Sequence, residues 1–107
     1  MDFTISENEK RELLYIARRA IADNLRIKFD YHSVTLHNEL FERKLGAFVT
    51  LHLDGDLRGC IGYITGVEPL YQTIEDMALS AAFRDPRFAP LSVDEFKEID
   101  IEISERR

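Results

Sequence analysis

The sequence predicts a β-hairpin over residues 47–64, and the pairing of its two strands decides which side chains face the core. Apolar residues recur at every second position over 47–53, a spacing typical of a strand with one buried face. Asp54-Gly55 is a strong signal for the turn, and a second strand follows it. Gly59 and Gly62 interrupt that second strand, which is typical of a bulge or of close approach by a backbone or a ligand.

Two registers are open to this hairpin, and they differ in the face on which Arg58 and Cys60 both lie. A two-residue turn would set Val49 opposite Cys60 and bring Arg58 onto the apolar face. A type I turn with a bulge, in which Gly55 takes the left-handed position, instead pairs Thr50 with Arg58 and keeps the apolar residues together. Because a slip of one residue inverts every side chain, we expect the second register.

The expected register gathers four polar residues on one face of the sheet, namely Thr50, His52, Arg58 and Cys60. Diagonal neighbours on such a face lie about 7–8 Å apart. A guanidinium beside the thiol would favour the reactive thiolate, and His52 would serve as a general base if it came closer. In the structural alternative Cys60 is a small buried residue and Arg58 a surface cation. This is the more common arrangement, because free cysteine is among the most buried residue types.

A helix is predicted on each side of the hairpin. The first covers residues 6–27, where Ser6 and Glu9 form a capping box and apolar residues recur at spacings of three and four. The second opens at Glu68-Pro69, because proline suits the first turn of a helix. It ends at Asp85-Pro86, because the residue before a proline is pushed out of the helical region.

Shorter elements complete the predicted fold. Residues 28–45 alternate weakly between polar and apolar and include a helical turn over 37–42. Ser92 and Glu95 predict one more short capped helix, and alternation over 99–104 predicts a half-buried strand. The order helix, hairpin, helix, strand indicates an α+β fold, with helices packed on one face of a mostly antiparallel sheet that has a central hairpin.

Length and composition bound the class of protein. The 107 residues make one domain, 1–107, in which 45% of residues are hydrophobic and no apolar run approaches the roughly 20 residues of a membrane span. A net charge of −6 argues against a protein that wraps duplex DNA. The single cysteine, Cys60, and three dispersed histidines predict no disulfide framework and no metal site, and imply no cofactor. We expect a soluble cytoplasmic protein.

The turn after the second helix, Arg84-Asp85-Pro86-Arg87-Phe88, brings together two arginines and a carboxylate. Arginine binds carboxylates and phosphates through paired hydrogen bonds, so this turn is a candidate anion clamp. In the structural alternative, Arg84 complements the helix dipole while Arg87 pairs with Asp85 or Glu95. The sequence does not choose between the two.

Four ordered segments carry a resemblance to a known family. Leu57-Arg58-Gly59-Cys60-Ile61-Gly62 reads LRGCIG, and it is preceded by GAFVTL over 46–51. The pattern MAxxAAFxDPRFxPL covers 77–91, and IEIS covers 101–104. Together they resemble the AMMECR family, whose hallmark is LRGCIG. The resemblance implies an α+β fold and a functional surface around LRGCIG, without an assigned activity.

The resemblance also implies partners and a difference in length. Family members are linked with Memo-like and radical-SAM proteins, and they usually continue past the IEIS strand. This chain stops at Arg107, so we expect it to lack the family's C-terminal stretch. An unpaired sheet edge would also allow a homodimer.

Three functions follow as hypotheses. In the first, the domain binds a partner protein or an anionic small molecule. The residues proposed for that binding are Thr50, His52, Arg58, Gly59, Gly62, Asp85 and Arg87. In the second hypothesis, Cys60 is the catalytic thiol of an enzyme. The third, a nucleic-acid-linked regulator, is opposed by the acidic charge balance and by the lack of a basic, aromatic groove.

Overall fold

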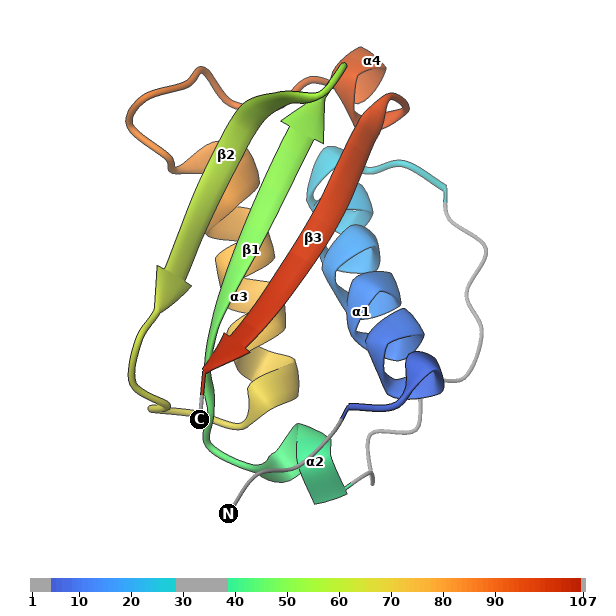
Figure 1. Cartoon of the computed structure of the whole chain (residues 1–107). Helices are drawn as coiled ribbons and strands as arrows, with labels where there is room; N and C mark the ends of the chain where they lie inside the picture. Colours follow the sequence, from blue (N-terminus) through green and yellow to red (C-terminus); the bar gives the residue numbers. More distant parts are fainter. Residues whose placement is uncertain (1–4, 29–38, 107) are drawn as a thin grey trace.

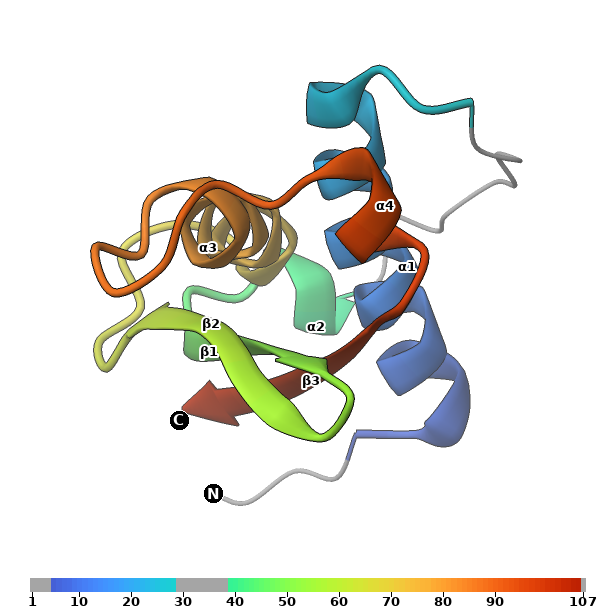
Figure 2. The same cartoon turned by 90° about the horizontal axis from the view of Figure 1, so that it is seen from above.

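Two long helices lie on one face of a three-stranded antiparallel sheet (Figures 1 and 2). The structure is a computed structural model that describes residues 5–28 and 39–106. In chain order its elements are α1 (Glu7–Leu25), α2 (Glu39–Glu42), β1 (Gly46–Leu53), β2 (Asp56–Tyr63), α3 (Leu70–Phe83), α4 (Val93–Phe96) and β3 (Ile99–Arg106).

The sheet has the order β2-β1-β3, so the first strand of the hairpin is also the central strand. Both of its neighbours run antiparallel to it. Figure 2 shows α3 and α4 above the sheet, α1 running down beside it, and no described helix below it. The predicted α+β fold, with helices on one face of an antiparallel sheet and a central hairpin, is therefore confirmed.

The core lies between the sheet and the two long helices. Alternate residues of β1 point into it, and Ala47, Val49 and Leu51 are fully buried. Because a helix presents residues three and four apart on one side, α1 and α3 each supply an apolar stripe to this core. The stripe of α3 lies against β1 and β2, and α1 packs against α3 and β3. The buried residues of the two stripes are Leu13, Ile16, Ala17, Ile21 and Ala22 of α1 and Leu70, Thr73, Ile74, Met77, Ala78, Ala81 and Ala82 of α3.

The predicted helix ends are close to the observed ones. The Ser6 hydroxyl accepts the Glu9 backbone N–H at 3.1 Å, and the Glu9 carboxylate accepts the Ser6 N–H at 3.0 Å, as a capping box requires. The same exchange between Ser92 and Glu95 begins α4.

None of the described helices is both long and apolar enough to cross a membrane.

The segment over 28–45 is described in part. Its weakly alternating residues Phe29, Tyr31, Val34 and Leu36 lie outside the described residues. The helical turn predicted over 37–42 is observed as α2 where the structure describes it.

The predicted hairpin register is wrong. Asp54 and Gly55 both have positive φ, 53° and 84°, which is the signature of a two-residue type I′ turn rather than a type I turn with a bulge at Gly55. The bulge lies further along: His52 pairs with Leu57, but Leu51 pairs with Gly59. Arg58 is the extra, unpaired residue of the second strand. Without it the two-residue turn would set Val49 opposite Cys60, and with it Val49 lies opposite Ile61 on the core side.

The bulge separates Arg58 from the residues with which it was predicted to share a face. Thr50 pairs with Cys60 instead of with Arg58, and Arg58 lies on the helix side of the sheet beside Gly59. Arg58 is only 8% exposed, so it is neither part of a polar surface nor a surface cation. The predicted placement of Thr50, His52 and Cys60 on one face is correct, although the register that produces it is different.

We call the side of the sheet that faces away from the helices the open face. Among the described residues no helix covers it (Figure 2). Its side chains follow from the register of the three strands. They are Phe48, Thr50 and His52 of β1, Leu57 and Cys60 of β2, and Asp100, Glu102 and Ser104 of β3, and Gly62 of β2 lies at the same face without a side chain.

Candidate functional site

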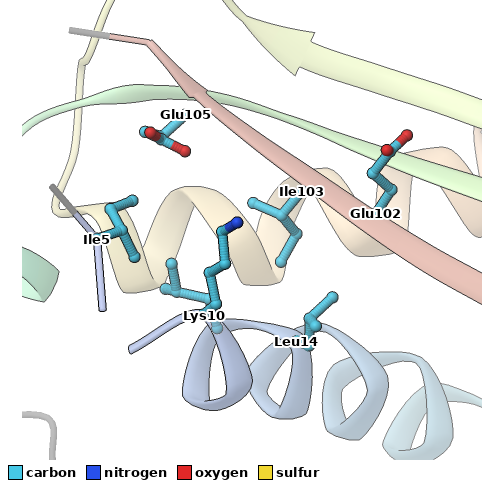
Figure 3. Close-up of a pocket in the computed structure, with 7 residues that line it drawn as sticks. Ile5, Lys10, Leu14, Glu102, Ile103 and Glu105 are labelled. Atoms are coloured by element: carbon cyan, nitrogen blue, oxygen red, sulfur yellow. The ribbon is translucent and has the colours of Figure 1, made fainter. Parts of the chain in front are cut away.

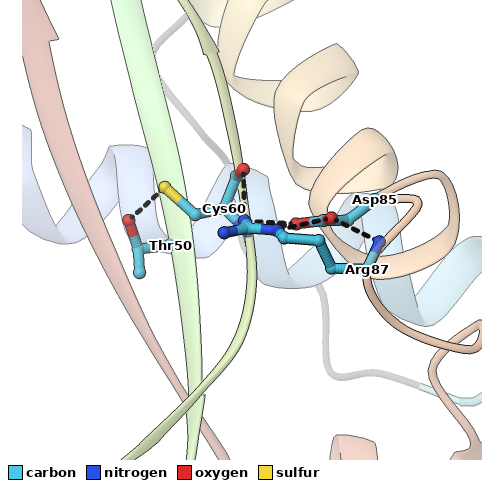
Figure 4. A network of polar contacts seen from close by, with 4 residues as sticks. All are labelled: Thr50, Cys60, Asp85 and Arg87. Atoms are coloured by element: carbon cyan, nitrogen blue, oxygen red, sulfur yellow. Dashed lines mark hydrogen bonds and ion pairs between the residues drawn. The ribbon is translucent and has the colours of Figure 1, made fainter.

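The backbone of Cys60 is held by an ion pair at the outer edge of β2 (Figure 4). Its N–H donates to Asp85 Oδ2 at 3.1 Å, and its carbonyl oxygen accepts from Arg87 Nη2 at 3.4 Å. An edge strand would otherwise leave both groups to solvent. Asp85 and Arg87 thus take the place of a further strand at this one residue, which ties the LRGCIG strand to the turn after α3.

Asp85 is the central acceptor of this arrangement. It is buried, and it also accepts from Arg87 through the backbone N–H at 3.0 Å, Nε at 3.0 Å and Nη2 at 2.7 Å. Hydrogen bonds from the Arg87 side chain hold the pKa of the Asp85 carboxyl well below its usual range. Burial raises this pKa, but the Arg87 side chain together with the backbone N–H donors of Arg87 and Cys60 outweighs it. The carboxylate is therefore charged at neutral pH.

The anion-clamp hypothesis loses support from this geometry. Arg87 directs Nε and Nη2 at Asp85, as the structural alternative predicted for that pair. Arg84 follows the last residue of α3, where its backbone N–H donates to the Ser80 carbonyl. Glu95, the other partner considered for Arg87, pairs with Arg58 instead.

The Cys60 sulfur lies on the open face beside a hydroxyl. Its distance to Thr50 Oγ1 is 3.2 Å, and Figure 4 shows the two side chains meeting between neighbouring strands. Because the N–H and C=O of Cys60 point away from β1, the two residues form a non-hydrogen-bonded pair, in which side chains approach most closely. His52 pairs with Leu57, so its imidazole is a diagonal neighbour of Cys60 and does not lie directly opposite it.

Arg58 connects β2 to α4 inside the helix layer. Its Nε and Nη2 donate to the two oxygens of Glu95 at 2.9 and 3.0 Å, and Nη2 also donates to the Ala89 carbonyl at 2.7 Å. The guanidinium carbon lies 5.6 Å from the centre of the Phe88 ring. Hydrogen bonds from Arg58 lower the pKa of Glu95 to about 2. This geometry gives Arg58 a role in holding the fold together.

The glycines of the LRGCIG strand allow close approach by backbone. A Cβ placed at Gly59 would collide with the carbonyl oxygen of Ala81 and lie 3.0 Å from its carbonyl carbon, so Gly59 lets α3 contact β2. A Cβ at Gly62 would lie 2.6 Å from the Cα of Phe48 on the neighbouring strand. The prediction of close approach is confirmed for both, with protein backbone as the approaching group.

Sequence reasoning missed Glu95, Ala89 and Phe88 as the partners of Arg58. The capping box that Glu95 forms with Ser92 was visible in the sequence, and it fixes the carboxylate in place. A second role for that carboxylate depends on a contact between residues 37 positions apart. A pattern of neighbouring residues carries no signal for such a contact.

The fold and this geometry define an α+β domain in which an LRGCIG strand is tied through Asp85 and Arg87 to a DPRF turn. The AMMECR1 family model matches residues 14–105. The chain therefore belongs to the AMMECR1 family.

Several relatives come from archaea. A protein of Methanothermobacter thermautotrophicus is 42% identical over 100 residues, which cover 94% of this chain and 52% of the relative. A Saccharolobus islandicus protein is 43% identical over 99 residues, and the match covers 88% of this chain and 43% of the length of that protein. The crystal structure of the uncharacterized protein PH0010 from Pyrococcus horikoshii matches with a TM-score of 0.83 and 35% identity, over 96% of this chain and 53% of that one. This chain spans about half the length of the relatives it matches.

Proposed function

We propose that this chain is a binding domain of the cytoplasm, that it engages a partner protein through the open face around Cys60, and that it acts with Memo-like and radical-SAM proteins. The observation that carries the proposal is the division of the LRGCIG strand between its two sides. Arg58 and Gly59 are directed at the helices, whereas Leu57 and Cys60 are directed at the open face. The AMMECR resemblance supplies the identity of the partners.

The composition of the open face favours a protein over a small anion. Arg58 and Arg87 each pair with a carboxylate, which reduces the charge they can offer to a ligand. The open face instead presents Leu57, which is 41% exposed, with partly buried Cys60 and then partly buried Phe48 further along the strands. Apolar groups within a polar surround are typical of protein interfaces.

The rigid attachment of β2 supports the same proposal. Cys60 is held through its backbone by Asp85 and Arg87, and the strand is paired with β1 on its other side. A surface that is already ordered loses less conformational entropy when a partner binds. We therefore expect the open face to bind without refolding.

Leu57→Glu is expected to weaken binding to the Memo-like or the radical-SAM protein by roughly tenfold or more, because it puts a charge into a desolvated contact. Val93→Glu is the matched control: Val93 is 43% exposed, close to the value for Leu57, but it lies in α4. We expect this second variant to bind like the wild type. Isothermal titration calorimetry with each purified partner, taken from the same genome, measures both affinities.

Two results would contradict the proposal. One is wild-type protein that binds neither partner at concentrations well above those of the cell. The other is equal loss of affinity in the two variants, which would mean that added negative charge matters and the open face does not. Both variants should remain folded, because each replaces an exposed side chain, and circular dichroism of each variant checks this.

A second candidate is a thiol-dependent enzyme that uses Cys60. The specific observation in its favour is that the sulfur is partly exposed and lies 3.2 Å from Thr50 Oγ1, a hydroxyl able to donate to a thiolate. This candidate requires Cys60 to react with iodoacetamide faster in the folded domain than in the unfolded chain. A thiol that reacts only after denaturant is added excludes it.

A further inference from the structure

The outer edge of β3 has backbone groups that face away from the sheet. The Ile99 carbonyl accepts from Arg18 Nη2 of α1 at 3.0 Å, so the backbone N–H and C=O of Ile99 point away from β1. Because this direction alternates along a strand, the backbone groups of Ile101 and Ile103 point away from β1 too. The other side of β1 gives the same result. The Cys60 backbone points away from β1, so the N–H and C=O of Thr50 point toward β3 and bond with Glu102. The residues on either side of Glu102 therefore direct their backbone groups outward. In the part of the chain that the structure describes, no strand pairs with this edge.

A cavity of about 220 Å³ lies between this edge and the first turns of α1. Its apolar lining comes from Ile5, Leu13, Leu14 and Ile103. Figure 3 shows Leu14 and Lys10 of α1 reaching toward Ile103 of β3. The volume exceeds the roughly 150 Å³ of an engineered cavity that accepts benzene, so a large apolar side chain fits.

The charge of the edge opposes a second copy of this chain. The side chains of Asp100 and Glu102 project from β3 on the open face, and both are exposed. An antiparallel pairing centred on Ile101 would put Asp100 of one copy opposite Glu102 of the other. A pairing centred one residue further along would put the two copies of Glu102 opposite each other. Like charges in directly opposed positions are destabilising, and the chain as a whole carries a net charge of −6.

We propose that the edge of β3 binds an extended, basic and apolar segment of a partner protein as an added antiparallel strand. Apolar side chains of that segment enter the cavity at Leu14 and Ile103, on the helix side. The intervening lysines or arginines lie on the open face, next to Asp100 and Glu102. Backbone hydrogen bonds to Ile101 and Ile103 supply affinity, and the cavity and the acidic pair select the sequence.

The added strand would lie at the β3 edge of the sheet, on the far side of β1 from Cys60, although its lysines would share the open face with the contact proposed around Cys60. The test of the added strand uses a fluorescent peptide of alternating lysine and leucine and the full chain. In an antiparallel pair the leucine amides face β3 and the lysine amides face solvent. Fluorescence anisotropy should therefore show a roughly tenfold loss of affinity when the leucine amides are N-methylated, and an unchanged affinity when the lysine amides are.

Protein variants test the side-chain contacts. Leu14→Arg fills the cavity mouth and should weaken peptide binding by roughly tenfold. Val93→Arg in α4 is the control, with the same change of charge at a residue of similar exposure, 43% against 36% for Leu14. It should bind like the wild type. Glu102→Lys should have a lower affinity for the lysine peptide and a higher affinity for a peptide with glutamate in place of lysine.

The proposal is overturned if the two N-methylated peptides bind alike, or if the two arginine variants lose affinity equally. Either result would show attraction to an acidic protein without strand pairing. A wild-type dimer in sedimentation that Leu14→Arg dissociates would also overturn it, because a second copy would then occupy the edge.

Discussion

Gly59→Ala is expected to lower the free energy of unfolding by about 3 kcal/mol, because the new methyl group would overlap the backbone of α3. The nearest atoms are the carbonyl oxygen and carbon of Ala81, which are main-chain atoms and cannot rotate away as a side chain would. Either α3 must move from the sheet or β2 must bend. Equilibrium unfolding in urea measures the loss.

Gly55→Ala is the control for this variant. Gly55 has a φ of 84° but no atom within 4 Å of an added Cβ, so it tests the conformational cost of alanine without a collision. That cost is about 1 kcal/mol for a left-handed residue. If Gly59→Ala costs no more than Gly55→Ala, then α3 and β2 are not as close as the structure places them.

Glu95→Gln is expected to destabilise the domain by about 2 kcal/mol at neutral pH, because it leaves the buried guanidinium of Arg58 without a counter-charge. This figure is below the usual loss for a fully buried pair, since the Glu95 side chain is 30% exposed and its charge is partly screened by water. Glutamine can still form the capping box with Ser92, so the helix start is retained. The substitution therefore isolates the ion pair.

The effect of Glu95→Gln depends on pH with a defined sign. The pKa of Glu95 falls from an ordinary 4.5 to about 2 in the folded protein, so the carboxylate contributes stability that is fully present above pH 4.5. That contribution is lost as the pH falls toward 2. The difference in unfolding free energy between wild type and variant should shrink over the same interval, as urea unfolding at a series of pH values would show.

The double variant Arg58→Met with Glu95→Leu distinguishes a structural ion pair from a functional one. Replacing both partners with apolar residues leaves no buried charge, and we expect it to recover the lost stability except for the Glu95 half of the capping box, which leucine cannot form. Full stability in Glu95→Gln at neutral pH would contradict this account of the pair. Loss of partner binding in a stable double variant would indicate that Arg58 also acts in recognition.

The predicted fold class was correct because each element has a local signal. The capping boxes at Ser6 and Ser92 and the prolines at 69 and 86 mark helix ends through interactions within a few residues.

The predicted hairpin register was wrong because two sequence signals, the turn and the apolar pattern, conflict. Asp54-Gly55 specifies a two-residue turn, and the apolar pattern requires an odd residue somewhere in the hairpin. The chain places that residue at Arg58, where Glu95 stabilises it, and not in the turn.

The candidate site could be predicted only where it depends on strand alternation. Thr50 and Cys60 share a face because each lies on the opposite side of its strand from the core residues. The contact of the Cys60 N–H with Asp85 joins residues 25 positions apart. The sequence placed both residues in recognisable motifs, but no local rule connects an edge strand to a turn beyond the next helix.

The rate at which iodoacetamide modifies Cys60, in the free domain and in the presence of a saturating partner, tests the proposed role of the open face directly. The thiol lies on that face and is partly exposed, so it should react in the folded domain. Bound Memo-like or radical-SAM protein should slow the reaction by roughly tenfold or more, because burial excludes the reagent. An unchanged rate in a complex shown by calorimetry to be fully formed would place the partner elsewhere and contradict the proposal.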